Sequence, residues 1–572
     1  MPWWLRRFVD FLGWMGARIT ARRYAVVSRK IGRTADEVEL PAERRRFLAL
    51  QIDGLSYETL LRAMAIGYTP TLQRLIATGH RLQSWRCGLP SSTPAVQAGI
   101  MYGNNWDIPA FRWYDKQSGD LVMCKFPPQV ARIKQRVKGE RIGILSGGSS
   151  YTNMMDGDAR LALFTLSAMG RQHFFEHLRG IGWAMLFVLN PLTTLRTVSF
   201  ATWHLLQAWS KAIVVWARGG MKRRLTLLKP FLQVVSNSIL GEIQTFGVLL
   251  DVYRGMPAIY ANFYGYDEVA HSAGPLGREA LSALRRIDGQ IRKIERVRHY
   301  YWPDMDLYVL SDHGMSESVP FREKSGQSLE EFVADHVQAT VARQEVDALN
   351  ADAGDPAGFL LDELAGIEAH LSPRGQRMTQ ALRHFIGGDD LVSPDESWDL
   401  QRSSDVIVRC SGNLAHLYFN VTREKMEVSE IAILYPELLR ALSRHPDIGL
   451  VLGMEDGHAV QISSDGAEGL SHAHWPAGLS HPEQTASELH RLLSFPSSGD
   501  LVLLGAWDPQ GRVVTFATQA ATHGGAGGAQ EEPFFLSPPG SAPNLSVIGN
   551  ARELYPYFMD RYHGVTGASV GH

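Results

Sequence analysis

Residues 47–54 read FLALQIDG, an apolar run from Phe47 to Ile52 that is followed at once by Asp53 and Gly54. A short apolar run that ends in a polar residue and a turn is typical of a buried strand in a parallel sheet, because such strands are covered on both faces. The carboxyl ends of parallel strands share one edge of the sheet, where ligands bind. The pattern therefore predicts a buried strand at 47–52 that brings Asp53 to a functional edge.

Comparable apolar runs recur and alternate with stretches of helical spacing. They lie at 142–145, 258–263, 306–310, 405–408, 414–419, 449–452 and 501–504. This alternation predicts an α/β fold with a mostly parallel central sheet.

Two stretches interrupt the alternation, so we expect them to be insertions. The first is basic, rich in tryptophan and helical at 165–255, and the second is acidic and helical at 325–400. The catalytic α/β domain is then expected in three parts, at 46–164, 256–324 and 401–563. A basic amphipathic segment at 1–45 and a tail at 564–572 complete the chain.

The overall composition excludes several classes of protein. In 572 residues, hydrophobic side chains make up 45% and charged side chains 20%, which is ordinary for a globular protein and unlike a disordered, collagen-like or multi-span membrane protein. Lys and Arg number 57 against 59 Asp and Glu, so the net charge of −2 does not call for a nucleic-acid duplex as partner. The three cysteines form neither a disulfide framework nor a metal-binding pair, which favours a reducing compartment.

The charge is nevertheless uneven along the chain. Residues 1–33 hold eight basic side chains and one acidic one, and residues 165–230 hold nine and one; together they carry seven of the 14 tryptophans. This composition is typical of helices that lie at a bilayer surface. The apolar runs at 181–195 and 197–210 are shorter than the roughly 20 residues of a spanning helix. We therefore expect these two segments to bind peripherally to the cytoplasmic side of an anionic membrane. The alternative is that they are helices packed on the protein's own surface.

Polar residues that could carry chemistry follow several of the apolar runs. They are Asp53, the pair Asp267 and His271, the adjacent Asp312 and His313, and His523 in a glycine-rich stretch. Singly, each fits a turn, a helix cap or a loop. Together, three carboxylates and three imidazoles suit two divalent ions of the zinc type, with manganese as the alternative. Thr93, in the loop at 88–94, either begins a helix before Pro94 or supplies an attacking hydroxyl.

These segments, in their order and in their residues, resemble the sequence motifs of the type I phosphodiesterase/nucleotide pyrophosphatase family of the alkaline phosphatase superfamily. The matching segments are IDG at 52–54, PSST at 90–93 before a helix that ends at Gly103, YDEVAHSAGP at 266–275, LSDHGM at 310–315 and HGG at 523–525. The resemblance implies a three-layer α/β/α sandwich and ester hydrolysis through a phosphorylated threonine, here Thr93. It also implies that Asp53, Thr93, Asp312 and His313 hold one metal and that Asp267, His271 and His523 hold the other.

The chain departs from the family at one position. Phe111 stands where nucleotide-processing members have an asparagine that holds a phosphoryl oxygen. We expect Asn104, Asn105 or Arg112 to substitute for it, and the departure leaves the substrate open between a nucleotide and a lipid head group.

The sequence therefore predicts a two-metal phosphoric ester hydrolase, foremost a phosphodiesterase, at a membrane surface. Two alternatives remain at this point. One is a phosphomonoesterase or phosphomutase on the same scaffold, and the other is a metal-binding membrane scaffold without turnover.

Overall fold

The computed structural model describes residues 45–169, 229–337, 341–342, 404–470, 475, 479 and 481–565, with backbone alone at 229–240 and 342. The N-terminal segment expected at 1–45 therefore lies almost entirely outside the described residues. The same holds for most of the two expected insertions and of the tail.

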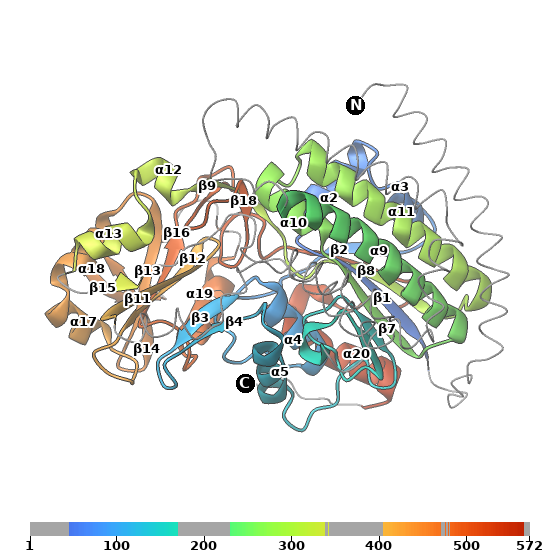
Figure 1. Cartoon of the computed structure of the whole chain (residues 1–572), viewed down its shortest axis with the longest axis horizontal. Helices are drawn as coiled ribbons and strands as arrows, with labels where there is room; N and C mark the ends of the chain where they lie inside the picture. The colour runs from blue at the N-terminus through green and yellow to red at the C-terminus, as the bar shows by residue number, and fades with distance from the viewer. Residues whose placement is uncertain are drawn as a thin grey trace, which may run out of the picture.

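A seven-stranded sheet forms the centre of the larger lobe (Figure 1). Its order is β2 (Arg81–Ser84), β19 (Phe534–Ser537), β8 (Asp306–Leu310), β1 (Phe47–Ile52), β7 (Ala258–Phe263), β5 (Ser149–Tyr151) and β6 (Leu161–Leu163). The five strands from β8 to β6 are parallel, whereas β19 runs antiparallel to both of its neighbours. The predicted α/β fold with a mostly parallel central sheet is thus confirmed.

Helices cover both faces of this sheet, which gives three layers (Figure 1). One layer holds α2 (Tyr57–Ala65), α3 (Pro70–Ala77), α9 (Lys229–Arg254), α10 (Gly265–Ala273) and α11 (Arg278–Tyr301). The other holds α4 (Thr93–Tyr102), α5 (Pro127–Lys138) and α20 (Tyr555–His563). All residues of β1, β7 and β8 are buried, as expected for parallel strands between two helical layers.

The strands expected at 258–263 and 306–310 are confirmed, but the one expected at 142–145 is wrong. Ile144 and Leu145 are fully buried, yet their backbone amides donate to Met101 and Gly157 carbonyls in a turn. Their apolar character reports burial, and the neighbouring strand is β5.

The later apolar runs build a second seven-stranded sheet in the smaller lobe. Its order is β10 (Val341–Ala342), β11 (Val406–Ser411), β12 (Leu414–Phe419), β16 (Leu501–Gly505), β13 (Ile448–Glu455), β14 (His458–Ser463) and β15 (Gly466–Gly469). Apart from the β10–β11 pair it is antiparallel, so the expectation that these runs extend the parallel sheet is wrong.

Both faces of this second sheet are covered, which explains its continuous apolar runs. In β16, Leu501 and Leu503 pack into one core with α13 (Leu329–Asp335), α17 (Val428–Leu434) and α18 (Pro436–Arg444). Val502 and Leu504 pack into another with α19 (Pro482–Leu493). A run buried on both sides looks the same in parallel and antiparallel sheets.

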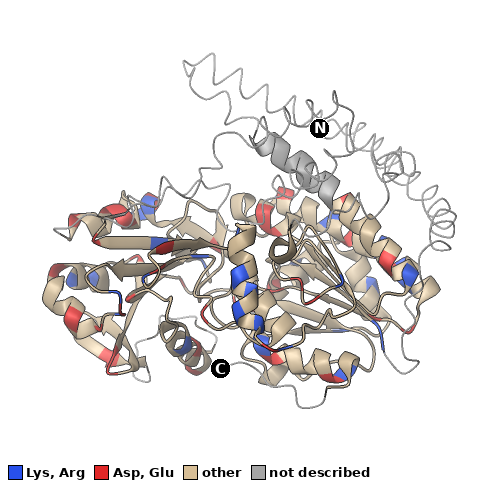
Figure 2. Cartoon of the chain, turned by 60° about the horizontal axis from the view of Figure 1, so that its bottom comes forward, with Lys and Arg blue, Asp and Glu red and all other residues tan. Residues whose placement is uncertain are grey.

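The described end of the first expected insertion belongs to the larger lobe. Residues 243–252 of α9 contribute buried side chains to its core, and α9 packs against α11 and β7. Residues 170–228 lie outside the described part. Among the residues that the structure describes, no helix is both long and apolar enough to cross a bilayer. Lys and Arg as well as Asp and Glu occur on both described lobes (Figure 2).

Candidate active site

The sheet order brings the predicted ligands together. Asp53 follows β1, Asp267 and His271 lie on α10 after β7, and Asp312 and His313 follow β8. Because β1 is hydrogen-bonded to both β7 and β8, these three carboxyl ends are adjacent at one edge.

His523 reaches this edge from another direction. It follows β18 (Ala521–Thr522), part of a three-stranded sheet with β9 (Ser316–Pro320) and β17 (Val513–Thr515). All six predicted ligands are at most 6% exposed.

Asp53, Asp312 and His313 form the first cluster of potential ligands. His313 Nε2 lies 3.5 Å from Asp53 Oδ1 and 3.5 Å from Asp312 Oδ2. The Thr93 hydroxyl joins them, with Oγ1 at 3.3 Å from Asp53 Oδ1 and 3.2 Å from His313 Nε2.

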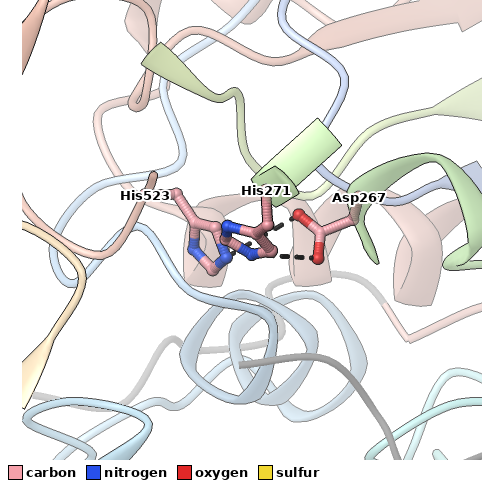
Figure 3. Close-up of side chains that lie close together, drawn as sticks. All are labelled: Asp267, His271 and His523. Carbon is pink, nitrogen blue, oxygen red and sulfur yellow. Dashed lines mark ion pairs between the residues drawn. The ribbon is translucent and has the colours of Figure 1, made fainter. Parts of the chain in front are cut away.

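Asp267, His271 and His523 form the second cluster. Figure 3 shows the two imidazoles converging on the carboxylate, with Nε2 of His271 at 3.3 Å from Asp267 Oδ2 and Nε2 of His523 at 3.7 Å from Asp267 Oδ1. The His523 ring also stacks on His313 with 3.9 Å between centroids, so the two clusters are contiguous.

Backbone carbonyls orient all three imidazoles in the same way. Each Nδ1 lies at hydrogen-bond distance from a main-chain oxygen, of Ala521 for His271 (2.8 Å), Gly314 for His313 (3.0 Å) and Ser91 for His523 (3.0 Å). A carbonyl only accepts, so Nδ1 carries the proton and the lone pair of a neutral ring is on Nε2. That is the outer-sphere arrangement of metal-binding histidines.

Burial and crowding perturb the acids and bases of the site. Burial raises the pKa of Asp53 well above its usual value, and the neighbouring Asp312 and Asp267 carboxylates add to the rise. Burial likewise raises the pKa of Asp312 to about 7 and lowers that of His313. For Asp267, burial opposes ionisation, but the nearby His271 and His523 outweigh it and lower the pKa. Without cations, the Asp53 and Asp312 carboxylates are hard to ionise together.

The donor atoms fit divalent cations. Ligands at metal distances of about 2.0–2.1 Å in a tetrahedron are about 3.3–3.4 Å from each other. The donor pairs described above are separated by similar distances. In addition, Asp267 Oδ1 and Asp312 Oδ2 are buried, and neither oxygen accepts a hydrogen bond from any residue that the structure describes. Nitrogen and oxygen donors of this kind suit zinc or manganese.

Two glycines permit the close packing of the site. Gly54 has a φ of 71°, and a Cβ there would lie 2.4 Å from Asp267 Oδ1. Gly412 has a φ of 65°, and a Cβ there would overlap the carbonyl oxygen of His523. The absence of a side chain at Gly54 therefore lets Asp53 of the first cluster lie close to Asp267 of the second.

Thr93 is the first residue of α4, a helix whose ten residues are all buried. The preceding loop is pinned by Ser91, whose Oγ donates to Gly525 O (2.7 Å) and accepts from Gly524 N (3.1 Å). The free backbone N–H groups at a helix N-terminus favour an anionic ligand, so the Thr93 hydroxyl lies where a phosphoryl group could be held.

Two of the three expected substrate-binding residues are not brought to Thr93. Asn104 and Asn105 follow the other end of α4, about 15 Å along the helix at 1.5 Å per residue. Their amides bond to Val137 and to Asn550.

Phe111 and Arg112 lie at the start of the hairpin of β3 (Arg112–Asp115) and β4 (Asp120–Met123). Phe111 is 1% exposed, and its amide donates to Ser411 Oγ beside Gly412. Arg112 is buried, with its guanidinium 5.9 Å from the Phe111 ring centre.

Sequence reasoning missed the residues that orient the ligands. Asn262, at the end of β7, donates from Nδ2 to Asp53 Oδ2 at 2.6 Å, and Ser91 holds the His523 ring and the Thr93 loop. Asn262 had one available signal, a polar residue near the end of an apolar run.

One protein family matches much of the chain. The sequence profile of the type I phosphodiesterase / nucleotide pyrophosphatase family matches residues 47–408. No curated protein sequence matches the chain.

Among solved structures, phosphonoacetate hydrolase from Sinorhizobium meliloti 1021 with phosphonoformate is 14% identical, at a TM-score of 0.44 over 91% of this chain and 97% of that one. An inactive murine ectonucleotide pyrophosphatase / phosphodiesterase 5 with AMP is 11% identical, at a TM-score of 0.44 over 92% and 97%. Both scores are low, so the assignment depends on the profile match, which covers more than half of the chain. The chain therefore belongs to the type I phosphodiesterase / nucleotide pyrophosphatase family and is a phosphoric ester hydrolase.

Proposed function

We propose that this chain hydrolyses phosphodiesters with Thr93 as the nucleophile, at a centre that holds two divalent cations. The observation that supports it most is the position of Thr93 Oγ1, within 3.3 Å of both Asp53 Oδ1 and His313 Nε2 at the N-terminus of a buried helix. A threonine hydroxyl is a weak nucleophile at its own pKa and needs such an activating environment.

Asp53, Asp312, His313 and Thr93 would hold one cation, and Asp267, His271 and His523 the other. The donor set favours zinc, with manganese as the alternative. Two cations held there would supply positive charge for the attacking and the leaving oxygen of a displacement at phosphorus.

The reaction then has two displacements. The Thr93 hydroxyl loses its proton as Oγ1 bonds to phosphorus, and the bond from phosphorus to the leaving oxygen breaks, so that an alcohol departs once it is protonated. Water next attacks the same phosphorus and breaks its bond to Oγ1. A phosphate monoester leaves, and Thr93 regains its hydroxyl.

The basic segments support a lipid-type phosphodiester as the substrate. Phe111 offers no side-chain donor to a phosphoryl oxygen, so the chain lacks the asparagine contact of nucleotide-processing members. The basic, tryptophan-rich residues 1–33 and 165–230 support peripheral binding to an anionic membrane, where such a substrate is found. Binding to vesicles with and without phosphatidylserine, by the full chain and by a 1–33 deletion, tests this; equal and negligible binding would contradict it.

Hydrolysis of a chromogenic phosphodiester and its matching monoester tests the reaction class. The chain is stripped with chelator and reloaded with zinc or manganese. The proposal expects cation-restored turnover that is faster on the diester. Faster turnover of the monoester would instead make the chain a phosphomonoesterase on this scaffold.

A further inference from the structure

Asn262 makes a contact with the centre that the proposed reaction does not use. It lies in β7, opposite Gln51 in the β1–β7 register, and it is 3% exposed. Its Nδ2 is 2.6 Å from Asp53 Oδ2. An ionised carboxylate only accepts hydrogen bonds, so the amide must present its NH₂ group to Asp53.

Because of this contact, the two carboxylate oxygens of Asp53 have different neighbours. Oδ2 is held by Asn262, whereas Oδ1 faces Thr93 Oγ1 at 3.3 Å and His313 Nε2 at 3.5 Å. Rotation of the carboxylate about its Cβ–Cγ bond would break the Asn262 bond. The amide therefore fixes the orientation in which the Asp53 carboxylate presents its other oxygen to a cation.

The backbone around Asn262 is itself held firmly. Its carbonyl oxygen accepts from Thr152 Oγ1 at 2.7 Å and from Gln244 Nε2 at 2.9 Å. Thr152 has a φ of 55°, a left-handed conformation that is costly for a β-branched residue and that persists only where the surroundings enforce it. The backbone strain at Thr152 therefore lies directly beside Asn262, the residue that orients Asp53.

We propose that Asn262 is a positioning residue for cation binding at the cluster of Asp53, Asp312 and His313, given the two-cation centre proposed above. Outer-sphere partners of metal ligands contribute about 10–100-fold in affinity. Loss of Asn262 should therefore weaken this cluster alone, because the residue bonds to no ligand of the Asp267, His271 and His523 cluster among the described contacts.

The test measures cation binding rather than turnover, in chains that retain one cluster. Asp267→Ala leaves the Asp53 cluster, and Asp312→Ala leaves the other. Into each background we introduce Asn262→Leu, or the isosteric Asn262→Asp in case the leucine variant fails to fold. Zinc is then titrated into the chelator-treated full-length chain by calorimetry, with circular dichroism to verify folding.

Gln244→Leu is the matched control. It also replaces a buried amide and also removes a bond to the Asn262 segment, but it does not touch Asp53. We expect Asn262→Leu to raise the zinc Kd of the Asp53 cluster about 10–100-fold and to leave the other cluster unchanged. Gln244→Leu should change both zinc Kd values much less, because Thr152 Oγ1 still holds the Asn262 carbonyl oxygen. Unchanged zinc Kd values for both Asn262 variants, equal loss at both clusters, or equal loss in Gln244→Leu would overturn the assignment of Asn262. Absence of zinc binding in the unmutated chain would instead refute the proposed centre.

Discussion

Replacement of Gly54 by alanine tests whether the two clusters must pack as closely as the structure has them. The φ of 71° makes any side chain unfavourable there, at about 1–2 kcal/mol. In addition, the new Cβ would lie 2.4 Å from Asp267 Oδ1, where an ordinary contact needs about 3.4 Å. Asp267 must therefore move by about 1 Å, and a misplacement of that size costs about 100-fold in rate.

Gly67→Ala provides the control because Gly67 has a φ of 78° and no atom within 4 Å of a Cβ. Gly67→Ala should lose about 1–2 kcal/mol of unfolding free energy, measured by urea titration, and Gly54→Ala should lose at least as much. Only Gly54→Ala should lose about 100-fold in kcat/KM on the diester and bind the second zinc more weakly. Equal activity of the two variants would refute the close-packing argument.

Two further outcomes follow from buried acids. Because burial raises the pKa of Asp53 and raises that of Asp312 to about 7, and because both carboxyls must lose their protons to bind a cation, zinc affinity should fall by at least about tenfold for each pH unit below 7. Calorimetry between pH 5.5 and 8 checks this, and a flat profile would contradict it. Glu488 of α19 accepts from Leu89 N (3.2 Å) and Asn550 Nδ2 (2.6 Å), so Glu488→Leu leaves two buried donors unpaired, each at about 1–3 kcal/mol. Urea unfolding should show that loss, whereas the exposed Glu483→Leu on the same helix should lose almost nothing.

The sequence was most informative where apolar runs end in polar residues. The runs that became β1, β7 and β8 are buried on both faces, so they are continuous and easily recognised, and their carboxyl ends carry Asp53, Asp267 and Asp312. Because the three strands are adjacent, these residues meet at one edge of the sheet. Their division into two clusters was an implication of the family resemblance.

Features that depend on three-dimensional packing could not be read in the same way. The run at 501–504 is equally apolar in a parallel or an antiparallel sheet, since both of its faces are covered. The carbonyls that orient the imidazoles are main-chain atoms and leave no mark in the sequence. The partner of Asn262 depends on the register of β7 against β1, which residue types alone do not specify.

The most direct test of the central claim is the fate of Thr93 during turnover. The zinc-loaded chain, Thr93→Ser and Thr93→Ala are mixed with the chromogenic diester and quenched in acid, and the peptide that contains residue 93 is examined by mass spectrometry. We predict, in the unmutated chain, a Thr93 peptide esterified with the phosphoryl group and the organic substituent that this group retains, and we predict residual turnover in Thr93→Ser. Thr93→Ala should show neither a phosphoryl adduct nor turnover, even when the variant is folded and zinc is added until both clusters are filled. Diester turnover that persists in Thr93→Ala would contradict the account.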